Sequence, residues 1–184
     1  TRGRRGPAGM AGVRKVVGAL LEFEAQYIVH QVSCIHTEPA SGLASAVFAK
    51  HPAADVYADR RERRGKGETV ANTISPPGTI SVHDGRIVNL YGQYIADKPV
   101  ADPPGEIPAL AGDTAAAFAC NPEVQDTREQ RLGWFKAGLR EIPKVLPEAT
   151  SIAIPQNVGC GIAGGVWAEY EAAIADFAAE NPGL

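Results

Sequence analysis

The sequence has little cysteine, no long apolar run and no strong excess of either charge. Its 3 cysteines, Cys34, Cys120 and Cys160, lack the close spacing of zinc ligands. A small and odd number of cysteines argues against a disulfide framework. It favours free thiols in a reducing, intracellular setting, either cytoplasmic or nuclear. No run approaches the roughly 18 apolar residues of a membrane helix, and no signal-peptide pattern is present. We therefore expect no metal, no cofactor and no membrane association.

Charge is close to balanced but unevenly distributed. The net charge of −3 gives no overall reason to expect nucleic-acid binding. Residues 1–12 carry three arginines and no acid, and we interpret them as a flexible basic arm or a remnant of expression cloning. The run DRRERRGKGE at 59–68 alternates bases with acids and lacks aromatics, so we expect a solvated surface segment. Residues 13–184 are then predicted to form a single domain.

Strand and helix patterns alternate along this domain. Strands are predicted at 13–23, 27–33 and 151–155, and two more within 78–93 are joined by an Asp84-Gly85 turn. Helices are predicted from Ser41 to before Pro52, within 53–68, from Asp126 or Thr127 to about 146, and over 166–181. The Pro- and Ala-rich stretch 97–124 is predicted to be an irregular insertion that could act as a lid. The pattern indicates an α/β fold whose mixed sheet is covered by helices on both sides.

A glycine-rich loop separates the last predicted strand from the last predicted helix. Gly159, Gly161 and Gly164 spell the GxGxxG of dinucleotide-binding folds. That motif requires a returning strand with an acid about 20 residues later, and the final predicted helix occupies the rest of the chain. The dinucleotide reading therefore fails. Glycines before a helix still favour a phosphate or diphosphate ligand, with a ligand-free turn as the alternative.

Five segments, in order, resemble those of macrodomains, and the resemblance spans about residues 13–180. The most specific is SIAIPQNVGCGIAGGVW at 151–167, which is similar to the ligand loop of the ADP-ribose-1''-phosphate phosphatase-like and single-domain ADP-ribosyl hydrolase branch. The others are VVGALLEFEAQYIVHQVSC, GLASAVFAKHP, GTISVHDGRIVNLYGQ and DTREQRLGWFKAGL. The resemblance implies a three-layer α/β/α fold, with ADP-ribose or a derivative as the ligand. It also suggests ADP-ribosylated macromolecules as partners, and we expect a monomer.

The resemblance also implies a set of ligand-binding residues. Leu20 would offer its backbone amide, and His36 would lie with the residues around the distal ribose. The central hairpin strand would face the cleft, and the glycine loop would hold the diphosphate. By position these ligand-binding residues are Leu20, Ser33, Cys34, Ser41, Gly42, Asn89, Tyr91, Gln93, Gly159, Cys160, Gly161, Ile162 and Ala163.

Departures from the family pattern affect both binding and catalysis. Ala19 replaces the acid that binds adenine, and Ala163 replaces the acid that follows the glycine loop in the hydrolases. His36 and Glu38 remain as candidates for proton transfer and for orienting water. We expect an ADP-ribose-binding domain that processes ADP-ribose-1''-phosphate or mono-ADP-ribosylated acceptors. The alternatives are a non-catalytic reader and a divergent domain with altered ligand specificity.

Overall fold

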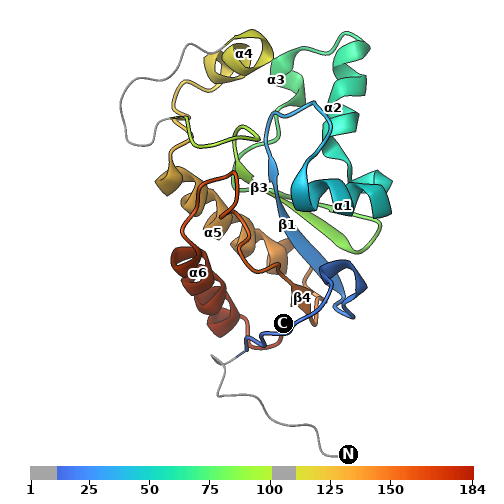
Figure 1. The fold of residues 1–184 in the computed structure, drawn as a ribbon, viewed down its shortest axis with the longest axis vertical. Coiled ribbons are helices and arrows are strands. Elements are labelled where there is room, and N and C mark those ends of the chain that lie inside the picture. Colours follow the sequence, from blue (N-terminus) through green and yellow to red (C-terminus); the bar gives the residue numbers. More distant parts are fainter. Residues whose placement is uncertain (1–11, 101–110) are drawn as a thin grey trace, which may run out of the picture.

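The computed structural model describes residues 12–100 and 111–184, whose strands form one mixed sheet in the order β2-β3-β1-β4. β1 (Tyr27–Ser33) is parallel to both β3 (Ile87–Gln93) and β4 (Ile152–Ala153), and β2 (Ile80–His83) is antiparallel to β3. Helices cover both faces of this sheet (Figure 1). The predicted α/β fold with a mixed sheet between helices is confirmed.

One face is covered by α1 (Gly42–Lys50) and α2 (Val56–Gly65), linked by the short helix η2 (Pro52–Ala54). Val47 and Phe48 of α1 and Tyr57 of α2 pack with Ile28 and Val32 of β1. The short helix α3 (Val70–Thr73) follows α2, and it lies against α4 (Gly112–Cys120). This layer carries the loop that follows β1.

The other face is covered by α5 (Arg128–Val145) and α6 (Trp167–Glu180). The helix predicted from Asp126 or Thr127 to about 146 is confirmed, and its residues Phe135, Leu139 and Ile142, which follow helical spacing, are fully or almost fully buried. They pack with Val29 of β1 and with the α6 residue Tyr170. Both helices begin at the carboxyl edge of the sheet and run back along it (Figure 1).

Two local predictions are confirmed in detail. Asp84 and Gly85 have φ of 51° and 59°, as a tight hairpin turn requires at both central residues. Thr127, rather than Asp126, caps α5, because its side chain accepts a hydrogen bond from the amide of Gln130.

The prediction of a strand at 13–23 is wrong. β2 and β4 form the two edges of the sheet, and this segment pairs with neither of them. It instead passes along α6, where Lys15 forms an ion pair with Glu171, and enters the short helix η1 (Leu20–Glu22).

The predicted insertion 97–124 contains α4, so it is not irregular throughout, while its residues 101–110 lie outside the described residues. The predicted arm also lies outside them, except for residue 12.

Candidate functional site

The carboxyl ends of the parallel strands meet at one edge of the sheet. The segments that leave this edge are residues 34–41 after β1, 94–97 after β3 and 154–166 after β4. Ligands of open α/β sheets bind at this edge. The fold brings the predicted residues His36, Glu38, Gln93 and 159–163 to it.

The glycine loop closes over a buried tyrosine. The amide of Gly165 donates to the carbonyl of Gly159 at 2.9 Å, which joins the two ends of the loop. Gly159 has φ of 70°, and a Cβ there would overlap the Tyr170 ring; a Cβ on Gly165 would lie 2.6 Å from the same ring. The Tyr170 side chain is fully buried, and its hydroxyl has no hydrogen-bond partner among the described residues. Gly159 and Gly165 are therefore required for the close approach of the loop to α6.

Within this loop, one turn leaves backbone donors free. The amide of Gly164 donates to the carbonyl of Gly161 at 3.0 Å and closes the turn. The amides of Gly161, Ile162 and Ala163 donate to no other described residue. Gly161 is exposed, and no atom lies within 4 Å of where its Cβ would be. Successive free amides of this kind can bind an anion.

Cys160 contributes packing rather than a reactive thiol. Its Sγ donates to the carbonyl of Val158 at 3.2 Å. Burial raises the pKa of this thiol, which keeps it protonated and weakly nucleophilic.

At the start of the loop after β1, the side chains of Ser33 and Cys34, both predicted to bind the ligand, are buried within the protein. The hydroxyl of Ser33 donates to the carbonyl of Tyr94 at 2.7 Å and accepts the amides of Ile35 and His36. The Cys34 side chain is fully buried, and burial raises the pKa of its thiol. Ser33 and Cys34 thus shape this loop, since the Ser33 hydroxyl is bonded within it and the Cys34 side chain is buried.

Three arginines of α2 hold the same loop by its carbonyls. Arg60 donates to the carbonyl of His36 at 3.1 Å and Arg61 to that of Thr37 at 2.6 Å, while Arg64 reaches that of Ile35 at 3.5 Å. Arg60 is only 2% exposed and lies over the rings of Tyr57 and Tyr91. The expectation of a solvated segment at 59–68 is therefore wrong for Arg60. It holds for Lys66, which pairs with Glu62 at the surface.

An open hollow of about 440 Å³ lies between this loop and α4. Its wall includes the two predicted catalytic residues, His36 and Glu38, together with Arg64 and Asp113. Arg64 and Asp113 form an ion pair at 2.6 Å across it. The segment after β3 contributes Ile95 and Ala96, so two of the three carboxyl-edge segments line this hollow.

His36 is half-buried, and its ring meets Tyr57 edge-on at 4.9 Å between centroids. Burial lowers the pKa of His36, and the nearby Glu38 carboxylate acts in the opposite direction. Because the pKa lies below its ordinary value, the imidazole is mainly neutral at pH 7 and can accept a proton.

Asn89 and Tyr91 do not face this edge, contrary to the prediction. Asn89 is fully buried in mid-strand, where it is hydrogen-bonded to His30 at 2.6 Å and to the carbonyl of Ala54 at 2.8 Å. The hydroxyl of Tyr91 lies 2.8 Å from that of Ser81. Both side chains belong to the layer beneath α1 and α2, because strand residues two apart share a face. Gln93 lies at the strand end and accepts a hydrogen bond from Gln31 at 3.0 Å.

Leu20 is not brought together with the other candidates. The segment around it is tied to the opposite edge of the sheet, where Lys50 donates to the carbonyl of Leu21 and Arg86 donates to that of Phe23. Ser41 and Gly42 lie at the start of α1, on the carboxyl edge and exposed. The Ser41 side chain makes no capping hydrogen bond.

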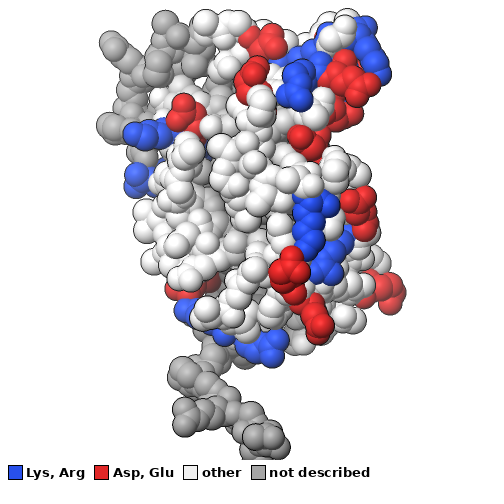
Figure 2. All heavy atoms as spheres, turned by 45° about the vertical axis from the view of Figure 1, so that its right-hand side comes forward, with Lys and Arg blue, Asp and Glu red and all other residues white. Residues whose placement is uncertain are grey.

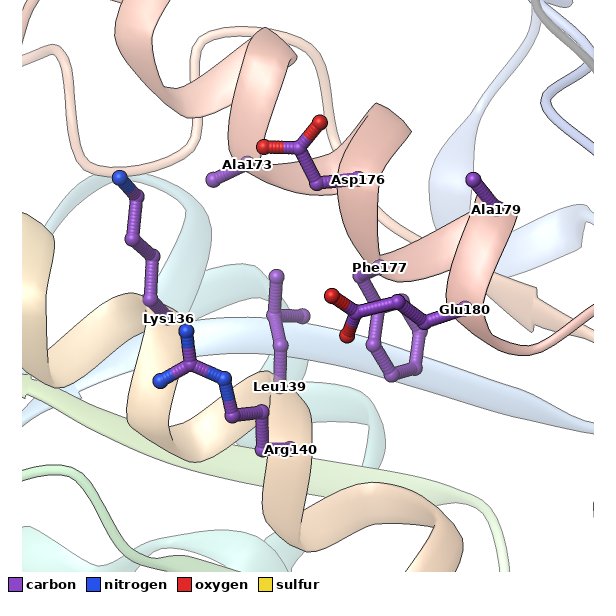
Figure 3. Close-up of a pocket in the computed structure, with 8 residues that line it drawn as sticks. All are labelled: Lys136, Leu139, Arg140, Ala173, Asp176, Phe177, Ala179 and Glu180. Atoms are coloured by element: carbon purple, nitrogen blue, oxygen red, sulfur yellow. The ribbon is translucent and has the colours of Figure 1, made fainter.

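A second hollow, of about 280 Å³, lies between α5 and α6 (Figure 3). Lys136 and Arg140 of α5 and Asp176 and Glu180 of α6 line it, with Phe177 among its apolar residues. These positions are well along both helices, so the hollow lies away from the carboxyl edge and contains no predicted site residue. On the face in Figure 2, basic and acidic side chains are interspersed, with no broad area of one sign.

Sequence reasoning missed the charged residues that support the site. The stripe Val56, Tyr57, Arg60 and Arg64 follows helical spacing, and this could have placed the two arginines on the buried face of α2. Arg131 forms a buried ion pair with Asp126, which precedes the helix, and no local pattern in the sequence reveals this pair.

No cluster of three metal-binding side chains is found among residues 12–100 and 111–184. Within the same ranges, no helix is long and apolar enough to span a membrane.

Comparison with solved structures supports the fold. The chain is similar to the macrodomain of Mycobacterium tuberculosis DarG, with a TM-score of 0.58 and 18% identity over 92% of this chain and 91% of that chain. The macrodomain of Thermus aquaticus DarG matches with a TM-score of 0.58 and 20% identity, over 92% and 91%. A protein of unknown function from Bacteroides thetaiotaomicron matches with a TM-score of 0.53 and 18% identity, over 85% and 83%. No family model and no curated protein matches the sequence. The chain therefore has a macrodomain-like fold, while membership of the family and of a branch within it stay predictions.

Proposed function

We propose that this chain binds ADP-ribose or a derivative at the carboxyl edge of its sheet. The observation that carries the proposal is the turn at Gly161–Gly164, which offers three amides without described partners. A diphosphate presents several acceptor oxygens and two negative charges, and free amides in a turn that precedes a helix suit it. The macrodomain-like fold supports the same ligand.

Two arginines beside the hollow also support an anionic ligand. Arg60 and Arg61 donate to carbonyls, and neither forms an ion pair with a described carboxylate. Arg60 is buried, so its charge is poorly screened by solvent.

Calorimetric titration with ADP-ribose tests the proposal, with two glycine variants as a matched pair. Gly161 and Gly133 are both exposed, have unstrained backbone and have no atom within 4 Å of an added Cβ. Gly161→Glu would place a carboxylate beside the diphosphate and should weaken binding at least tenfold. Gly133→Glu, on α5, should bind as the wild type does. Failure of the wild type to bind at millimolar ADP-ribose would refute the proposal.

A second candidate function is hydrolysis of ADP-ribose-1''-phosphate or of mono-ADP-ribosylated acceptors. His36 supports it, because a half-buried, neutral imidazole on the wall of the hollow could accept a proton from an attacking water. Release of phosphate or of ADP-ribose from these substrates should be lost in His36→Ala, which should retain ADP-ribose binding. His83→Ala, in β2, is the control. Turnover that is unchanged in His36→Ala would exclude this role.

A further inference from the structure

A buried ion pair lies behind the glycine loop. Arg131, in the first turns of α5, donates through Nε and Nη2 to the two carboxylate oxygens of Asp126, at 2.7 and 2.5 Å. Both side chains are fully or almost fully buried. A bidentate pair of this kind fixes the plane and direction of the guanidinium.

Arg131 and Asp126 also form hydrogen bonds to backbone groups of the segments at the carboxyl edge of the sheet. Nη1 of Arg131 donates to the carbonyl of Asp97 at 2.7 Å and to that of Ala163 at 3.0 Å. The Asp126 carboxylate accepts the amide of Tyr94 at 3.1 Å and that of the next residue at 3.4 Å. One ion pair thus joins the segment after β3 to the glycine loop.

The bond to Ala163 acts on the turn that leaves amides free. The carbonyl of Ala163 and the amide of Gly164 belong to one planar peptide group. That amide closes the turn by donating to the carbonyl of Gly161. Arg131 therefore fixes the peptide that closes the turn, and with it the conformation in which the amides of 161–163 stay free.

We infer that Arg131 and Asp126 are positioning residues for the anion-binding turn. The inference rests on the proposed function for its ligand, but its structural part stands on the contacts above. Stability alone explains the pair poorly, because apolar residues of similar size often stabilise a core as well as a buried ion pair does. Its four bonds to the backbone of two edge segments explain it directly.

Arg131→Lys tests this inference, because lysine keeps the charge but cannot bind both carboxylate oxygens and both carbonyls in a fixed plane. Amide hydrogen exchange of Gly164 and Gly165, followed by NMR in the unliganded protein, should become at least tenfold faster. ADP-ribose affinity should fall at least tenfold. Thr127→Ala is the matched control: it removes the cap of the same helix, should lower the melting temperature and should leave exchange in the loop unchanged. Loop exchange in Arg131→Lys equal to that of the control would overturn the inference.

The wild-type protein gives an independent test should Arg131→Lys not fold. Because one pair holds both segments, Gly164, Gly165 and Tyr94 should exchange through the same opening event, with similar protection. Protection of the loop a hundredfold weaker than that of Tyr94 would contradict the inference. Absence of ADP-ribose binding by the wild type would refute the proposed function alone, since the exchange data do not involve the ligand.

Discussion

The two loops that meet at the carboxyl edge use their polar groups in opposite ways. In the loop after β1, the Ser33 hydroxyl binds backbone on both sides, and arginines of α2 donate to successive carbonyls. In the glycine loop, the amides of Gly161, Ile162 and Ala163 have no described partner. The polar groups of the first loop are thus used within the protein, whereas the second loop has backbone donors that no described residue uses. On this difference we base the proposal that an anion binds at the glycine loop.

The largest expected effect comes from adding a side chain where the glycine loop packs on Tyr170. Gly159→Ala forces a positive φ on a residue with a Cβ and drives that Cβ into the Tyr170 ring. We expect a loss of about 3 kcal/mol of unfolding free energy, measured by urea denaturation. Gly161→Ala is the control, and should change stability by about 0.5 kcal/mol or less because its Cβ meets open space. Equal effects in the two variants would show that the loop does not pack on Tyr170 as described.

A smaller effect is expected from removing one bond to the loop after β1. Arg60→Ala leaves the carbonyl of His36 and the hydroxyl of Ser75 without their donor in a buried site, so we expect a loss of about 2 kcal/mol. Arg61→Ala removes a similar bond to the neighbouring carbonyl at the surface and should cost about 0.5 kcal/mol or less. Thermal unfolding of both variants measures the difference. Similar losses would mean that burial of Arg60 adds nothing to this contact.

The smallest expected effect is a change in the titration of His36. Burial lowers its pKa and Glu38 opposes that shift, so Glu38→Gln should lower the pKa of His36 further. Since the folded pKa lies below the unfolded one, His36 supports stability at neutral pH, and that support is lost as the pH falls through the folded value. NMR titration of the imidazole in both proteins provides the measurement. An unchanged pKa would show that Glu38 does not act on His36.

Features set by near neighbours in the chain could be predicted from the sequence. The Asp84-Gly85 turn follows from backbone preference, and the buried stripe of α5 follows from helical spacing. The position of the glycine loop after a strand and before a helix was also predicted correctly, because its glycines are a local pattern.

Features that depend on distant partners could not be predicted in this way. The apolar run at 13–23 has strand-like residues, but it lies along α6 and enters the short helix η1 instead of joining the sheet. Asn89 and Tyr91 lie on a strand next to the site, yet their side chains bind His30 and Ser81 in the layer below α1 and α2. The bonds from Arg131 to Asp97 and Ala163 join residues more than 30 positions apart. Such contacts are set by tertiary packing and leave no local pattern.

The most direct test of the central claim is an NMR titration of the backbone amides with ADP-ribose. If the free amides hold the diphosphate, Gly161, Ile162 and Ala163 should show the largest shifts. Ile35 and His36, whose amides already donate to Ser33, should shift little. Saturable binding with its largest shifts outside residues 159–165, or no shift at millimolar ligand, would contradict the account.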